Sequence, residues 1–130
     1  MPVPTARCLG ASALFLVDDL PKALAHYEER LGFRTAFVYQ GVYGAVERDG
    51  VVIHLKPAAK TPGERENRAR NHHLDLYVAV DDARALHHEL SARGATVTGL
   101  EDQPWRQREF TVTDADGYIL LFGQDLDRKA

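Results

Sequence analysis

The chain carries an internal repeat, and this feature limits the folds available to it. The segment LFLVDDLPKALAHYEERLGFRT (residues 14–35) is matched in the second half by LYVAVDDARALHHELSARGATVT (residues 76–98). A second pair follows in the same order, with YGAVERDGVVIHL at residues 43–55 and EFTVTDADGYILLF at residues 109–122. One such unit is too small to bury its apolar face alone, so we expect two similar modules that share a core.

Each half contains the start and stop signals of one helix. In the first half Asp19 is placed to cap the helix, Pro21 falls in its first turn, and Gly32 follows its end. In the second half, Asp82 is placed to cap the helix and Gly94 follows its end. Apolar residues at helical spacing lie between the signals: Leu20, Leu24, Tyr27 and Leu31, then Leu86 and Leu90.

An Asp-Gly pair in each half, at residues 49–50 and 116–117, separates two apolar runs and predicts a β-hairpin. Each half therefore reads as βαβββ, and the predicted fold class is α+β. We expect the two modules to form a curved mixed-sheet cup within a single domain, residues 1–130. The first module spans residues 8–56 and the second residues 72–124, while residues 57–71, with two prolines and many charges, predict an exposed linker.

Composition limits the partners and the cellular compartment. A chain of 130 residues is about one domain, and its formal net charge of −3 is not typical of a nucleic-acid-binding face. The apolar stretch CLGASALFLV, residues 8–17, is too short to span a membrane and is interpreted as a buried strand. Its single cysteine, Cys8, permits no disulfide within the chain and is expected to be a small buried residue. We expect a cytoplasmic protein.

Strand alternation predicts which side chains face the cup. In the segment of residues 73–80, four apolar residues share one face, and His73, Asp75 and Tyr77 share the other. In the segment of residues 51–56, His54 belongs to the cup side. A shift of 63 residues superposes Ser12 on Asp75, and a shift of 67 residues superposes His54 on Leu121. We expect these four positions to converge if the modules face each other around a pseudo-twofold axis.

Further residues are candidates for the wall of the cup. Trp105 could stack on a planar or cationic ligand, or it could pack in the core or in an interface. Glu109 alternates with apolar Phe110, so it could face the cup or form a surface ion pair with Arg108. Tyr39 and Tyr43 could line the rim or be ordinary strand aromatics. The predicted ligand-binding set is Ser12, His54, His73, Asp75, Tyr77, Trp105, Arg108, Glu109 and Leu121, and the catalytic residues are unknown.

Two segments resemble the vicinal oxygen chelate superfamily, which includes glyoxalase I, extradiol dioxygenases and bleomycin resistance proteins. They are LVDDLPKALAHYEERLGF, which is similar to the family's first helix, and PWRQREFTVTDADGYILLFGQ, which looks like a bleomycin-resistance-type ending. The resemblance covers nearly all of residues 8–124. It implies the glyoxalase/bleomycin resistance fold. Two modules with curved, half-open sheets would leave an apolar edge for a partner to cover, so we also expect a symmetric homodimer.

The resemblance also implies where a metal would bind. Metal enzymes of this family place His, Gln or Glu at three or four of the quartet positions, which here hold Ser12, His54, Asp75 and Leu121. Because Leu cannot bind a metal and Ser is a poor neutral ligand, we expect no metal cofactor and a protein that binds and sequesters a small aromatic or cationic molecule. The alternative is a divalent-metal-dependent lyase, isomerase or dioxygenase that uses His54, His73 and Asp75. A third possibility is a structural or regulatory module with an unused cavity.

Overall fold

The computed structural model describes residues 4–58, 64, 66–67 and 73–128. Its first half contains β1 (Ala13–Val17), α1 (Leu20–Leu31), β2 (Arg34–Tyr39), β3 (Tyr43–Arg48) and β4 (Val51–Pro57). The four strands form one sheet in the order β1-β4-β3-β2, in which β1 and β4 are parallel. This is the predicted βαβββ module, and β4 runs one residue past the expected boundary.

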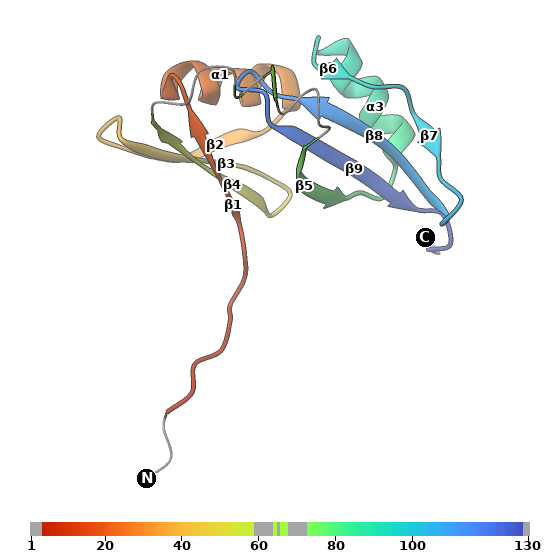
Figure 1. Ribbon diagram of the computed structural model, residues 1–130, viewed down its shortest axis with the longest axis horizontal. Helices are drawn as coiled ribbons and strands as arrows, with labels where there is room; N and C mark the ends of the chain where they lie inside the picture. Colours follow the sequence, from red (N-terminus) through yellow and green to blue (C-terminus); the bar gives the residue numbers. More distant parts are fainter. Residues whose placement is uncertain (1–3, 59–63, 65, 68–72, 129–130) are drawn as a thin grey trace.

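The second half repeats this plan with one addition. It contains β5 (Leu74–Ala79), α3 (Ala83–Ala92), β6 (Thr96–Val97), β7 (Glu101–Asp102), β8 (Gln107–Thr113) and β9 (Ile119–Asp125). The order in the sheet is β5-β9-β8-β6, and the short β7 also pairs with β8. The two sheets lie side by side, with α1 over one and α3 over the other (Figure 1). The predicted α+β class with two repeated modules is confirmed.

The local signals that define the helices act as the sequence predicts. The side chain of Asp19 accepts a hydrogen bond from the Lys22 N–H at 3.0 Å, and Gly32 ends α1 with a φ of 72°. Asp82 likewise accepts from the Ala85 N–H at 3.0 Å. Each cap satisfies a backbone donor that has no partner within the helix, which fixes where the helix starts.

The strand registers confirm that the two halves are equivalent. Phe15 pairs with Leu55 in the first sheet, and the residues 63 and 67 positions later, Val78 and Phe122, pair in the second. The equivalence fails at the start of β5, where the register shifts between Leu74 and Leu76. This β-bulge changes the direction of the side chains before it. Leu74, one of the four apolar residues expected to share a face of this strand, is exposed.

The N-terminal segment differs from its interpretation as a buried strand. Residues 4–12 form no strand, and β1 begins only at Ala13. This segment runs away from the body of the molecule in Figure 1. Cys8 is exposed, so its assignment as a small buried residue is wrong. Strand alternation could not show this, because the segment lacks the neighbouring strand that would bury it. Among the described residues, no helix is long and apolar enough to cross a membrane.

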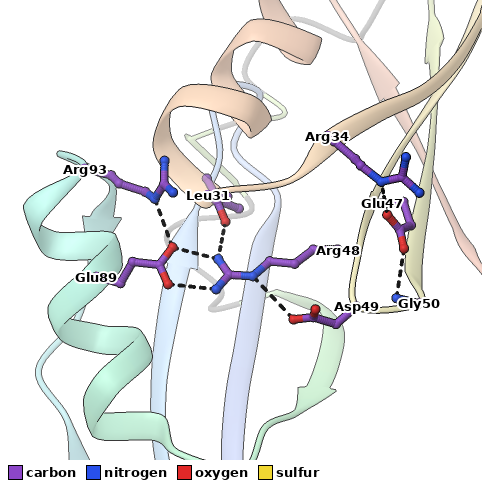
Figure 2. A network of polar contacts seen from close by, with 8 residues as sticks. All are labelled: Leu31, Arg34, Glu47, Arg48, Asp49, Gly50, Glu89 and Arg93. Carbon is purple, nitrogen blue, oxygen red and sulfur yellow. Dashed lines mark hydrogen bonds and ion pairs between the residues drawn. The ribbon is translucent and has the colours of Figure 1, made fainter.

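Several polar contacts join the two modules, among them the buried hydrogen bond that the Tyr27 hydroxyl donates to Oδ2 of Asp114 at 2.7 Å. Tyr118, after the second Asp-Gly turn, stacks on Phe15 with ring centroids 4.2 Å apart, and its hydroxyl donates to the Leu16 carbonyl at 2.9 Å. Arg48 also forms a bidentate ion pair with Glu89 of α3, as Figure 2 shows. One apolar core includes buried residues of both modules.

Candidate functional site

The first sheet presents an aromatic cluster on the face away from α1. Tyr43 and His54 are held by β3 and β4, and the Tyr43 hydroxyl lies 2.9 Å from Nδ1 of His54. Phe37 of β2 completes the cluster, with its ring centroid 6.1 Å from each of the other two. Phe37 is 45% exposed, so the cluster offers ring surface to a ligand or a partner. We call this surface the first open face.

Phe37 is a residue that sequence reasoning missed. The signal was available in the hairpin: Tyr39 pairs with Tyr43, so the residue two positions before Tyr39 lies on the same side of the sheet. Ser12 lies close to this cluster and, with His54 and Tyr43, lines a shallow hollow. All residues lining this hollow come from the first half: Leu9, Gly10, Ala11, Ser12, Ala13, Leu14, Tyr43 and His54.

The second sheet presents a polar patch on its own open face. Tyr77 of β5 lies over Gly123 of β9, and its hydroxyl donates to Oε1 of Gln107 at 2.7 Å. A methyl group at Gly123 would collide with the Tyr77 hydroxyl, so a larger residue there would force this ring to move. Leu121 pairs with Tyr77 and carries the apolar part of the same surface. We call this surface the second open face.

Glu109 is the feature of the second open face that most directly points to a ligand. It pairs with Gly123 across β8 and β9, which brings its carboxylate close to Tyr77. Glu109 is only 9% exposed, and within the described residues it accepts no hydrogen bond and forms no ion pair. Partial burial of Tyr77 raises the pKa of its hydroxyl, and the nearby charge of Glu109 raises it further. A carboxylate next to an aromatic ring favours a cationic partner.

Two other predicted residues lie away from this patch. Arg108 forms a bidentate pair with Asp102, with Nε donating to Oδ1 at 2.7 Å, so its suggested ion pair with Glu109 is not formed. Alternation along β8 turns Arg108 and Glu109 to opposite sides. Trp105 lies in the turn before β8 and is 63% exposed, so the possibility of core packing is wrong.

Asp75 makes a backbone contact that strand spacing did not predict. It lies at the bulge of β5, and its Oδ2 accepts a hydrogen bond from the Ile119 backbone N–H at 2.8 Å. Because the bulge interrupts the alternation between Asp75 and Tyr77, strand spacing alone no longer supports the prediction that they share a cup-facing row. His73 is exposed and immediately precedes β5.

The predicted quartet is divided between the two sheets. Ser12 and His54 lie on the first open face, whereas Asp75 and Leu121 belong to the second sheet. Among the described residues, no group of three or more His, Cys, Asp or Glu side chains could hold a metal ion. His54, His73 and Asp75 are all described, so this chain alone does not assemble them as a triad.

Apolar side chains remain exposed across both open faces. They include Leu14, Leu16, Phe37, Tyr39 and Tyr77. Contiguous apolar surface of this kind usually marks a binding surface.

Comparisons with known proteins agree with this geometry. The family model described as Glyoxalase/Bleomycin resistance protein/Dioxygenase superfamily matches residues 11–122. The bleomycin-binding protein of Streptomyces verticillus, solved with copper(II)-bleomycin, is 22% identical with a TM-score of 0.70; the match covers 91% of this chain and 97% of that one. A glyoxalase-related enzyme from Clostridium phytofermentans is 21% identical with a TM-score of 0.75, covering 92% and 97%.

A third similar structure is the bleomycin resistance determinant encoded on the transposon Tn5. It is 18% identical with a TM-score of 0.71, and the match covers 89% of this chain and 97% of that one. No match is found among curated proteins. At these identities the structural likeness shows the fold, while the family model assigns the chain to its superfamily.

Proposed function

Because the chain belongs to the glyoxalase/bleomycin resistance protein/dioxygenase superfamily, we propose that it binds and sequesters a small aromatic or cationic molecule without a metal ion. The observation that carries this proposal is Glu109, a residue only 9% exposed whose carboxylate has no hydrogen-bond or ion-pair partner among the described residues and lies near the exposed ring of Tyr77. The structures of bleomycin-binding proteins with the same fold add support. A cation would supply an opposite charge that Glu109 does not find among the described residues.

We further propose that the complete binding cavity forms between two chains. Within one chain the open faces lie side by side, each on the side of its sheet away from the helix. A symmetric dimer could place the first open face of one chain against the second open face of its partner. The cavity would then combine His54, Tyr43 and Phe37 with the partner's Glu109 and Tyr77, and the exposed apolar side chains would be covered.

This arrangement can be tested with mixed dimers and a panel of bleomycin and small aromatic cations. His54→Ala or Glu109→Gln, each as a homodimer, should damage both cavities. When the two variants are co-expressed, the mixed dimer should contain one doubly altered cavity and one intact cavity. We expect the best ligand of the panel to bind this mixed dimer at half the wild-type stoichiometry with wild-type affinity.

The control is a mixture of the two purified homodimers without exchange of subunits, which should show no intact site. A monomer at tens of micromolar, on the order of concentrations at which modest dimers form, would contradict the shared cavity. A mixed dimer with no restored site would also contradict it.

A further inference from the structure

A cavity of about 420 Å³ lies between the two modules, and none of the residues named for the two open faces lines it. It is bounded by the end of α1, the β3–β4 hairpin, β5 and α3. Most of its wall is apolar: Leu31, Phe33, Val51, Val78, Val80, Leu86, Leu90 and Phe122. This volume falls within the range of small-molecule pockets.

The repeat explains why this space is open. The positions equivalent to Val51, Val78 and Leu90, at shifts of 67, 63 and 63 residues, hold Tyr118, Phe15 and Tyr27. At these equivalent positions, the ring of Tyr118 stacks on Phe15 at an interplanar angle of 5°, and both rings are buried.

At Val51, Val78 and Leu90, three smaller aliphatic side chains stand where these rings would be. All three line the cavity. The cavity is therefore the counterpart of a space that tyrosine and phenylalanine rings fill elsewhere in the same molecule.

Backbone groups at the cavity wall repeat those that bind the Tyr118 hydroxyl. That hydroxyl donates to the Leu16 carbonyl at 2.9 Å and accepts from the Leu16 N–H at 3.0 Å. The equivalent residue of β5 is Ala79, which lines the cavity. Because the Val80 N–H donates to the Gly123 carbonyl of β9, the alternation of backbone groups turns the N–H and carbonyl of Ala79 to the outer edge of β5. A hydroxyl on a ligand ring could bind there as Tyr118 does at Leu16.

Charge at the rim selects among ligands of this shape. The guanidinium of Arg48 donates to both carboxylate oxygens of Glu89 at 2.7 and 2.9 Å, and Nε of Arg93 donates to the same carboxylate at 2.9 Å (Figure 2). These two cations and one carboxylate leave one positive charge beside the rim. The remaining charged residues that line the cavity are acidic: Asp49, Asp81 and Asp82. Asp49 lies 3.7 Å from Arg48 Nε and is highly exposed, so this contact is weak. The rim thus favours a positively charged group.

We propose that this inter-module cavity binds a phenol that carries a protonated amine. The ring takes the place that Tyr118 occupies in the other half, its hydroxyl binds the backbone of Ala79, and its ammonium group lies among the rim carboxylates. This site is separate from the open faces and does not depend on their function.

Tyramine is the probe for the test, followed through the methyl signals of the full-length protein by NMR. We expect tyramine to shift the methyl signals of Val51, Val80 and Leu86, with those of Leu14 and Leu16 as the control for the open face. Phenethylamine lacks the hydroxyl and 3-(4-hydroxyphenyl)propionate has an anionic arm. Each should bind at this site about tenfold more weakly, as expected when a hydrogen bond or a charge contact is lost.

Val51→Tyr restores the ring found in the other half, so it should fill the cavity, abolish the tyramine-induced shifts and raise the melting temperature. Ala85→Trp closes the cavity from an exposed position of α3 and serves if the first variant does not fold. The proposal is overturned if tyramine at about 10 mM, a concentration that would detect weak sites, leaves the cavity methyl groups unshifted. Shifts that survive the cavity-filling variant, or equal affinities for the three probes, would also overturn it.

Discussion

The hydroxyl of Tyr43 lies 2.9 Å from Nδ1 of His54, and this contact joins the two central strands of the first sheet at its open face. It fixes the orientation of the imidazole while leaving the ring partly accessible. A preoriented ring loses less conformational freedom when a ligand binds, which favours affinity.

Tyr43→Phe should therefore weaken binding of the best panel ligand only modestly. The change keeps the aromatic ring and removes one hydrogen bond with a net worth of about 0.5–1.5 kcal/mol, or roughly two- to tenfold in affinity. His54→Ala removes the ring itself and should lower the affinity more. Calorimetric titration measures both, and equal affinities for all three proteins would place the ligand elsewhere.

Glu109→Gln should weaken a cationic ligand strongly without unfolding the protein. A charge-assisted contact contributes about 1.5–3 kcal/mol, so we expect roughly a tenfold to hundredfold loss of affinity. Stability should change little, because the substitution keeps the size of the side chain and breaks no hydrogen bond or ion pair with the described residues.

Glu101→Gln is the matched control, since Glu101 pairs with Glu109 across β7 and β8 but is exposed. A large loss in both variants would indicate a general effect of net charge. Unchanged affinity in Glu109→Gln would remove this residue from the site.

Asp75→Ala should lower stability. The substitution leaves the Ile119 N–H at the bulge without its acceptor, which costs about 1–3 kcal/mol for a fully buried donor and less for this partly exposed one. Asp75→Asn retains an acceptor oxygen and should lose less. Urea unfolding compares the free energies of unfolding of the three proteins. If Asp75→Ala unfolds at the same urea concentration as the wild type, the hydrogen bond does not contribute to stability.

The ion pair between Arg48 and Glu89 should make part of the stability depend on pH. The hydrogen bond from Arg48 lowers the pKa of Glu89 below its ordinary value of 4.5. The stabilisation is therefore present above pH 4.5 and is lost as the pH falls through the lowered pKa. Because both groups are partly solvated, we expect at most about 1 kcal/mol.

Glu89→Gln tests this dependence. Between about pH 6 and 8, Glu89 of the wild type is fully ionised in both the folded and the unfolded protein. In this range the free energy of unfolding of Glu89→Gln should lie below that of the wild type by a constant amount. The difference should shrink on acidification below pH 4.5. A difference that stays constant down to the acid transition would show that this pair does not carry the pH dependence.

Local signals allowed much of the fold to be predicted, and long-range geometry accounts for the misses. The caps at Asp19 and Asp82 and the two Asp-Gly turns depend on neighbouring residues, so the sequence states them directly. The bulge at Asp75 depends on pairing with β9. Asp75 contacts Ile119 of that strand, which lies 44 positions later in the sequence. Alternation alone therefore could not show this contact.

The candidate site was predicted only in part for the same reason. Tyr77, Glu109 and His54 could be assigned to open faces from alternation, but the relative placement of the two sheets is set by contacts such as Tyr118 on Phe15. The inter-module cavity arises because Val51 differs from its distant counterpart Tyr118. Its presence becomes evident only when the registers establish that equivalence.

The most direct test of metal-independent sequestration is a calorimetric titration of the ligand panel into chelator-treated protein, followed by mass analysis of the recovered ligand. The account predicts saturable binding of an aromatic or cationic ligand, the same affinity with and without chelator, and full recovery of the unaltered ligand. Binding that disappears with chelator and returns with Zn, Fe, Mn or Ni, together with chemical conversion of the ligand, would contradict it.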